Sequence, residues 1–182
     1  MTGLRARYIR WAGAVWCLFM AAPAGVHAAT ATLTNTLNAN IGALGALAAP
    51  GTATLSNTGT LFNAYTGTVA LQYRARTSAA GGGTLTIKVT QDFQTGGPSV
   101  AGGDLTYSCG AASLGTACAN TTASTSSATQ VVTLPSSACT GGGSPCSGTD
   151  PNTVTLTFTL ADRPVDKTGS FTATVQFTIS AT

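Results

Sequence analysis

The chain has no glutamate, and its only histidine, His27, stands near the N-terminus. A Ser-His-Asp or Cys-His arrangement, or a histidine-bound metal, is therefore excluded for a mature chain that begins after this residue. Acid–base chemistry there would depend chiefly on five aspartates and two lysines, and none of the aspartates stands in a recognisable catalytic setting. We therefore expect no enzymatic activity and no cofactor. A secreted hydrolase with paired aspartates is the third-ranked alternative.

Charged residues are also scarce, at 7% of the chain, and the formal net charge is +3. Three of the eight basic residues (Arg5, Arg7 and Arg10) lie in the first ten positions, which leaves five basic residues against five aspartates. A chain with balanced charge and no basic stripe is not expected to bind nucleic acid or to be drawn to anionic membranes.

The N-terminus has the pattern of a secretory signal peptide. An apolar run at 11–24 follows the basic start, and Val26-His27-Ala28 ends in a small residue. This pattern predicts a signal peptide over residues 1–28, cleaved after Ala28, with an uncleaved signal anchor as the alternative. The apolar run is short for a bilayer span and no later segment is hydrophobic enough, so we expect no membrane span after cleavage. The mature protein is expected to be secreted, periplasmic or at the cell surface.

Threonine alternates with large apolar residues near the C-terminus, at 153–160 and again at 171–179. Side chains of a strand point alternately to its two faces, so each segment has one apolar and one polar face. We predict that these two segments form a half-buried antiparallel pair and that the upstream chain covers its apolar face.

Further strands are predicted upstream, at 29–41, 52–56, 66–76, 84–93, 105–108 and 130–134. Val69, Leu71 and Tyr73 share one face of 66–76, and Leu85, Ile87 and Val89 are the expected inward face of 84–93. The segment 42–50 favours an apolar connection or an irregular edge strand, because it contains glycines and a proline. About eight strands in residues 29–182 predict a single all-β domain, an Ig-like or Greek-key β-sandwich, with a barrel or jelly roll as the alternative.

Four cysteines follow the predicted leader: Cys109, Cys118, Cys139 and Cys146. An even number of cysteines in an exported chain is expected to form disulfides, and of the three possible pairings we favour the local one, Cys109–Cys118 with Cys139–Cys146. A zinc site is the alternative, but its ligand pairs normally stand about two to four residues apart, closer than these.

Few other residues suggest a site. Asp162 and Asp166 share one loop and are a minor candidate for Ca²⁺, although no defined ligand pattern surrounds them. Arg74 and Arg76 share one strand face and are candidates for anion binding, with solvated charges on an edge strand as the favoured explanation. Tyr65 with Phe62 is a small candidate for stacking on a glycan, whereas Tyr73 and Tyr107 fall on apolar strand phases and are expected in the core.

The terminal strand, 172–180, resembles the end of bacterial WxL-type surface domains. Phe177-Thr178-Ile179 stands where those domains have Trp-x-Leu, and Gly169 precedes it in a similar way. The leader and threonine-rich strands also resemble secreted spore-coat-U and fimbrial-type β-sandwich proteins. The resemblance implies a bacterial exported structural or surface-associated protein of sandwich fold.

We therefore expect a non-enzymatic structural or cell-surface protein whose partners are copies of itself or other envelope proteins. The alternating segment 30–41 could complete its own sandwich, which we favour, or insert into a neighbour by strand addition. The alternative function is an extracellular binding module for a glycan or another surface ligand, through the loops at 109–151.

Overall fold

A computed structural model describes residues 36, 38–57, 59, 61–139, 146 and 151–182. By its internal contacts the chain divides into residues 1–38 and 39–182, and the following description concerns the second unit. The predicted signal peptide and its cleavage site, and most of the predicted strand 29–41, lie outside the described residues.

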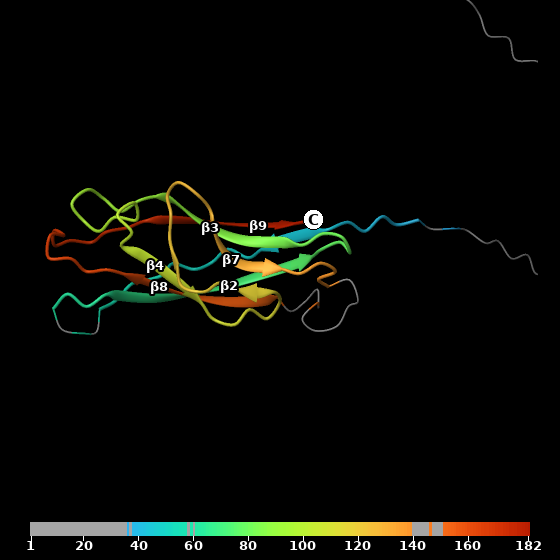
Figure 1. Cartoon of the computed structure of the whole chain (residues 1–182), viewed down its shortest axis with the longest axis horizontal. Helices are drawn as coiled ribbons and strands as arrows, with labels where there is room; N and C mark the ends of the chain where they lie inside the picture. The colour runs from blue at the N-terminus through green and yellow to red at the C-terminus, as the bar shows by residue number, and fades with distance from the viewer. Residues whose placement is uncertain (1–35, 37, 58, 60, 140–145, 147–150) are drawn as a thin grey trace, which may run out of the picture. The chain divides into compact units, whose positions relative to one another are not determined.

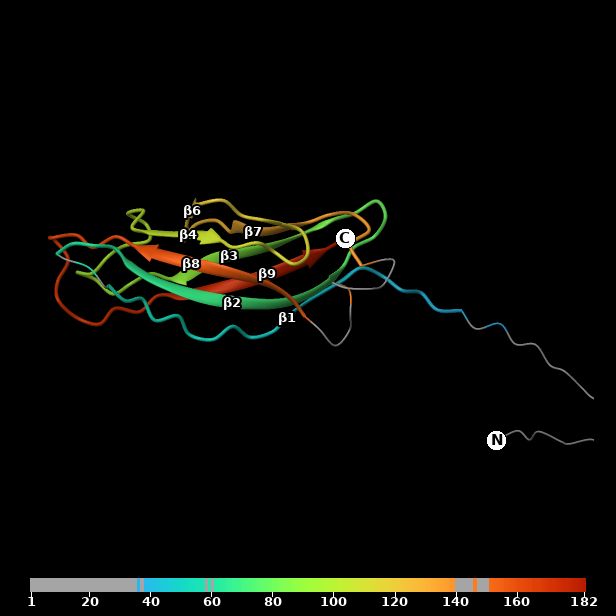
Figure 2. The ribbon, with the colours of Figure 1, turned by 90° about the horizontal axis from the view of Figure 1, so that it is seen from below.

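Two antiparallel sheets make up this unit (Figures 1 and 2). The five-stranded sheet has the spatial order β1 (Leu44–Leu47), β2 (Tyr65–Arg76), β8 (Asn152–Leu160), β4 (Leu105–Cys109) and β6 (Thr121–Thr122). The four-stranded sheet has the order β5 (Thr116–Ala117), β7 (Thr129–Leu134), β3 (Gly83–Gln91) and β9 (Thr174–Ala181). The predicted all-β sandwich is confirmed.

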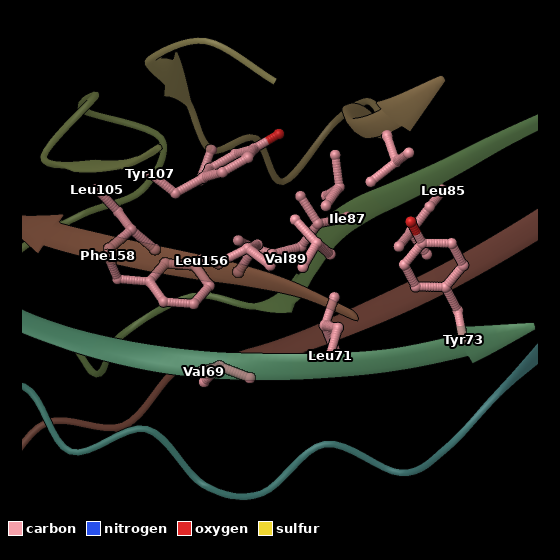
Figure 3. Packing of buried hydrophobic residues seen from close by; sticks show 14 of the residues in the cluster. Val69, Leu71, Tyr73, Leu85, Ile87, Val89, Leu105, Tyr107, Leu156 and Phe158 are labelled. Atoms are coloured by element: carbon pink, nitrogen blue, oxygen red, sulfur yellow. The ribbon is translucent and has the colours of Figure 1, made fainter. Parts of the chain in front are cut away.

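The core lies between the two sheets, where the apolar phase of each long strand points inward (Figure 3). In β2 the buried residues alternate with exposed ones, and β3 and β8 follow the same rule. The inward residues on these strands are Val69, Leu71 and Tyr73, then Leu85, Ile87 and Val89, then Val154, Leu156, Phe158 and Leu160. The inward phases predicted from the alternation are confirmed.

The predicted pairing of the two C-terminal strands is wrong. β8 pairs with β2 and β4, whereas β9 pairs with β3 in the other sheet. Alternation fixes which face of a strand is apolar but not which strand lies beside it. The connection 161–173 is much longer than the two to five residues typical of a hairpin, and it crosses from one sheet to the other. Val175, Phe177 and Ile179 of β9 therefore pack against the core from the opposite sheet.

Several strand limits also differ from the predictions. The segment 52–56 makes only an isolated bridge, between Ser56 and Thr66, and residues 38–41 are in no strand. The segment 42–50 contains β1, a short edge strand, and the loop 109–128 contains β5 and β6. Strands of two residues carry no detectable periodicity, which is why the sequence did not reveal them.

Candidate functional site

The structure contains the local disulfide pairing. Cys109 ends β4 in the five-stranded sheet, and Cys118 follows β5 in the four-stranded sheet, with a Cα–Cα distance of 5.2 Å. The Cys118 amide donates to the carbonyl of Val131 in β7 at 2.8 Å. This disulfide therefore ties the two sheets together at the side of the sandwich where β5 and β6 lie.

The second disulfide, Cys139–Cys146, closes the loop that follows β7, with a Cα–Cα distance of 5.0 Å. Thr77, which is buried at the end of β2, holds the start of this loop. Its hydroxyl donates to Pro135 O at 2.7 Å and accepts from the Ala138 amide at 2.8 Å. Thr77 could not be predicted from the sequence, because a threonine after a strand carries no sign that it is buried.

The described parts of the two disulfide-bearing loops come together where β8 begins, since the Ser113 hydroxyl donates to Asn152 Oδ1 at 3.3 Å. The loop 109–128 follows the side of the fold, since Gly110 donates to Thr155 O at 2.7 Å and Ser113 donates to Thr153 O at 3.0 Å. The loop after β7 begins at the end of the sheets, where Leu134 is paired with Gly83. A groove of about 580 Å³ beside residues 122–127 is lined by small and hydroxyl side chains and has no aromatic ring for stacking.

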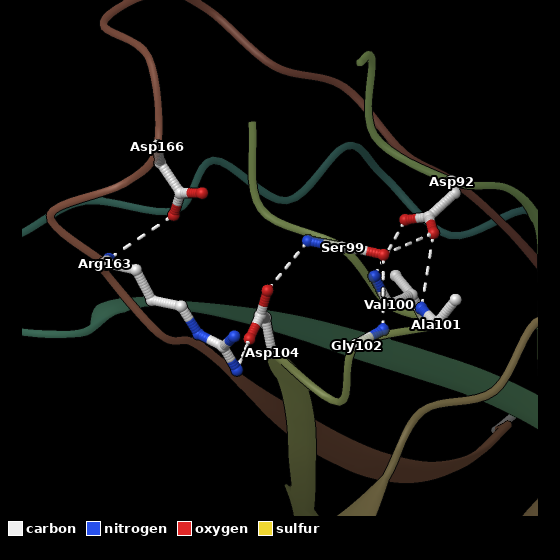
Figure 4. Close-up of polar contacts among 8 residues, drawn as sticks. All are labelled: Asp92, Ser99, Val100, Ala101, Gly102, Asp104, Arg163 and Asp166. Carbon is white, nitrogen blue, oxygen red and sulfur yellow. Dashed lines mark hydrogen bonds and ion pairs between the residues drawn. The ribbon is translucent and has the colours of Figure 1, made fainter. Parts of the chain in front are cut away.

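Two aspartates, Asp92 and Asp104, organise the loop between β3 and β4 (Figure 4). The Asp92 carboxylate accepts hydrogen bonds from the Phe93 and Val100 amides, both at 2.8 Å, and from the Ala101 amide and the Ser99 hydroxyl. Partial burial raises the pKa of Asp92, but these hydrogen bonds outweigh it and hold the pKa below its ordinary value. Asp92 is therefore a structural anchor of this loop.

Asp104 joins this loop to the loop between β8 and β9. Its carboxylate is buried, accepts the Ser99 amide at 2.9 Å and forms an ion pair with the half-exposed Arg163. The Ala161 amide donates to the Asp104 carbonyl at 2.9 Å, and the Lys167 amide donates to Gly96 O at 2.8 Å. The two loops thus form one connected layer over this end of the sandwich.

The candidate ligand residues are not assembled into a metal site. Asp166 accepts the backbone amide of Arg163 at 3.3 Å, which is the behaviour of a turn former. Within the described part of the chain, no group of three or more His, Cys, Asp or Glu side chains is placed to share a metal ion. Among the described residues, Asp162 and Asp166 therefore have no third His, Cys, Asp or Glu side chain with which to bind Ca²⁺.

Arg74 and Arg76 do not lie on an edge strand, so the favoured explanation for their charges is wrong. β2 has β1 on one side and β8 on the other. Arg76 donates to Gly42 O from Nε at 2.9 Å and from Nη2 at 2.7 Å, and thereby holds the chain just before β1. The sequence did not reveal this because β1 itself was ambiguous.

β9 is the longest edge strand of the described sandwich. β9 is eight residues long and pairs on one side only, with β3. The other three edge strands are short, with four residues in β1 and two each in β5 and β6. Protected edges usually carry charges or prolines, and β9, Thr-Val-Gln-Phe-Thr-Ile-Ser-Ala, has neither.

An open apolar groove runs beside this edge. Its volume is about 550 Å³, and its walls are residues 47–50 on one side and Thr174–Phe177 of β9 with Thr90 on the other. Ile179 of β9 lies close to Gly45 of β1, so the two edge strands lie on the same side of the sandwich. A β-strand added beside β9 could therefore form backbone hydrogen bonds with its outer edge and pack side chains against the apolar lining of the groove.

Comparison of the chain with protein-family models, with curated proteins and with solved structures finds no match. Over the residues that the structure describes, no helix is long and apolar enough to cross a membrane. The two disulfides fit an extracellular or periplasmic protein.

Proposed function

We propose that this chain is an exported, non-enzymatic structural or cell-surface-associated protein whose copies assemble by strand addition at β9. The observation that carries the proposal is the long, uncharged outer edge of β9, which has no partner strand among the described residues. Long uncharged edges of this composition pair readily with another chain unless something covers them.

The segment 29–41 supplies the strand. Leu33, Leu37 and Ile41 share one face of its alternation, and the other ten residues are threonine, asparagine and alanine. Its described residues, 36 and 38–41, take part in no strand of the described sandwich, and Ile41 is 71% exposed. On the basis of these five residues we propose insertion into a neighbour in place of the self-contained arrangement. An added strand contributes backbone hydrogen bonds, and its alternate side chains fill the groove.

Export is supported by the basic and apolar leader together with the two disulfides. The bacterial surface or envelope setting rests on the resemblance to WxL-type, spore-coat-U and fimbrial-type domains. A framework of two sheets with cross-linked loops suits a mechanical or surface role.

A peptide of residues 29–41 tests the proposal when added to the shortened chain 42–182. We expect saturable binding, measured by fluorescence anisotropy, because the peptide restores the missing strand in trans. A peptide of the same composition with its alternation scrambled is the control, and it should not bind. Equal binding of the two peptides, or no binding of either, would contradict strand addition.

If the two peptides bind equally, or neither binds, the alternative function to test is a binding module for glycans. The rings of Phe62 and Tyr65 are 53% and 36% exposed and would be the first to substitute. Retention of the chain on a polysaccharide, lost on Phe62→Ala, would support that function in its place.

A further inference from the structure

The segment that follows β1 runs beside β2 (Figure 2) but does not continue the regular pairing. Leu47, the last residue of β1, is opposite Tyr73, and the isolated bridge joins Ser56 to Thr66. Between these two points the outer segment advances nine residues, whereas β2 advances seven. The outer segment therefore contains two extra residues, which form a bulge.

The burial of the side chains shows where the bulge lies. Half-buried residues occur at every second position on both sides of it: Gly45, Leu47, Ala53 and Leu55. Residues 48–52 between them are all exposed, so the two extra residues lie there, around Pro50 and Gly51. Because the excess is an even number, the side-chain phase is unchanged, and Ala53 and Leu55 again pack against the core.

The bulge interrupts the backbone pairing along the outer edge of β2. The segment bonds to β2 at its two ends, with N–O distances of 2.9 Å: Ala48 to Gln72, and Ser56 to Thr66. Alternate residues of a strand direct their backbone groups to the same side, so those of Thr68 and Ala70 also point toward the segment. Among the residues that the structure describes, no backbone hydrogen bond joins residues 49–55 to either of them.

The groove beside β9 lies at this bulge. Where β1 is paired with β2, the two edge strands are in contact, since a Cβ added at Gly45 would be 3.1 Å from Ile179 Cγ1. Where the bulge interrupts the pairing, the groove separates residues 48–50 from Val175 and Phe177 of β9. The segment proposed to enter it, 29–41 of a neighbouring copy, is uncharged and has large apolar side chains on one face, which suits this apolar lining.

We infer that the bulge at Pro50 and Gly51 holds this groove open and thereby makes β9 able to accept a strand. This inference rests on the proposed strand addition and names the element of the acceptor that controls it. A bulge with a proline can instead protect only the edge to which it belongs. In that case its removal would not affect β9, and the following experiment separates the two explanations.

Deleting Pro50 and Gly51 removes the two extra residues and joins the register of β1 to that of the Ser56 bridge, with every inward residue still inward. Thr68 and Ala70 then gain partners in the ladder, so their amides should exchange with solvent at least about tenfold more slowly, as measured by hydrogen exchange. Pro50→Ala with Gly51→Ala keeps the length and is the matched control, in which this exchange should not slow.

Sedimentation velocity of residues 29–182 gives the decisive comparison. The deletion variant should associate at least about tenfold more weakly than the unaltered chain, because its groove is closed, whereas the control should associate normally. A labelled sample of the deletion variant should still join assemblies of the unaltered chain, because its segment 29–41 can still be donated. Undiminished association of the deletion variant would overturn the inference and leave strand addition standing. Equal weakening of the control would also overturn it, because the extra length would then not be the cause.

A substitution keeps the test valid if the deletion variant does not fold. Ala49→Asp leaves the register intact and puts a charge on the bulged wall of the groove, so it should also weaken association at least about tenfold. Thr52→Asp, at an exposed position outside the groove lining, is its control, and equal effects of the two would overturn the inference. An unaltered chain that is monomeric at every concentration would contradict the proposed strand addition itself, and the inference with it.

Discussion

Single polar residues hold together those parts of the chain that have little apolar surface to bury. Asp92 accepts four hydrogen bonds from residues 93–101, and Thr77 holds the loop after β7 by its hydroxyl. Tyr107 in β4 lies with its hydroxyl 2.8 Å from both Thr129 Oγ1 and Gln130 O in β7, so that it joins the two sheets. Burial raises the pKa of the Tyr107 hydroxyl above its ordinary value.

Replacing Asp92 should make the free energy of unfolding less dependent on pH in the acid range. The pKa of Asp92 is lowered in the folded chain, so its contribution is complete above the ordinary value of 3.8 and is lost as the pH falls through the lower folded-state value. Asp92→Asn should lower the free energy of unfolding by about 1–2 kcal/mol at neutral pH. Urea unfolding at several pH values measures the difference from the unaltered chain, which should shrink below pH 3.8. A difference that is constant with pH would contradict this role.

Removing the Tyr107 hydroxyl should cost about 1 kcal/mol, because Tyr107→Phe leaves the Gln130 carbonyl without this partner while the ring still fills the core. Tyr65→Phe is the matched control, since Tyr65 is partly exposed and should change stability little. Urea unfolding of both variants gives the comparison, and equal effects would contradict the cross-sheet role.

At the scale of elements, the Cys109–Cys118 disulfide closes the side of the sandwich where the strands are shortest. A loop of this length contributes about 2.5 kcal/mol by the chain-entropy model. The double substitution Cys109→Ala with Cys118→Ala should therefore lower the free energy of unfolding by about that amount while β2, β3 and β8 keep their pairing. Circular dichroism and urea unfolding measure this, and an unchanged stability would mean that the β5 and β6 side is held by its hydrogen bonds alone.

A charged side chain on β9 tests whether the outer edge of this strand is the assembly contact. Gln176→Lys adds a charge to the edge strand and should weaken assembly, because charged edges resist pairing. Lys88 of β3 lies directly opposite, so the melting temperature checks that the fold tolerates the like-charge pair. Gln72→Lys makes the same change at an exposed position of β2, which has a strand on each side, and serves as the control. Light scattering compares the two variants, and equal effects would show that the edge of β9 is not the contact.

The strands also show which features of the fold could be predicted from the sequence and which could not. Alternation in β2, β3 and β8 predicted which residues are inward, because those strands are long enough for a period of two to be seen. It did not predict that β8 and β9 lie in different sheets, since strand pairing depends on contacts distant in sequence. The candidate assembly edge was missed for the same reason, because a strand is recognised as an edge only when its neighbours are known.

At the scale of the whole molecule, the described unit is a sandwich with one long edge strand, β9, that pairs on one side only. Its described side chains include five basic groups and four aspartates, so the described unit carries little net charge. Assembly through the backbone edge of β9 and the apolar groove beside it should therefore change little as ionic strength rises, since salt screens only exposed charges, over about 10 Å at 0.1 M. Sedimentation velocity at low and high salt measures the change, and assembly that weakens strongly with salt would indicate a contact between charged surfaces and contradict this account of the contact.

The most direct test of the account is light scattering after size exclusion on oxidised residues 29–182, over a concentration series and beside residues 42–182. We expect the mass of the longer chain to rise with concentration, because each copy donates a strand and offers an edge, while the shortened chain stays monomeric. A monomer of the longer chain at every concentration would contradict self-assembly.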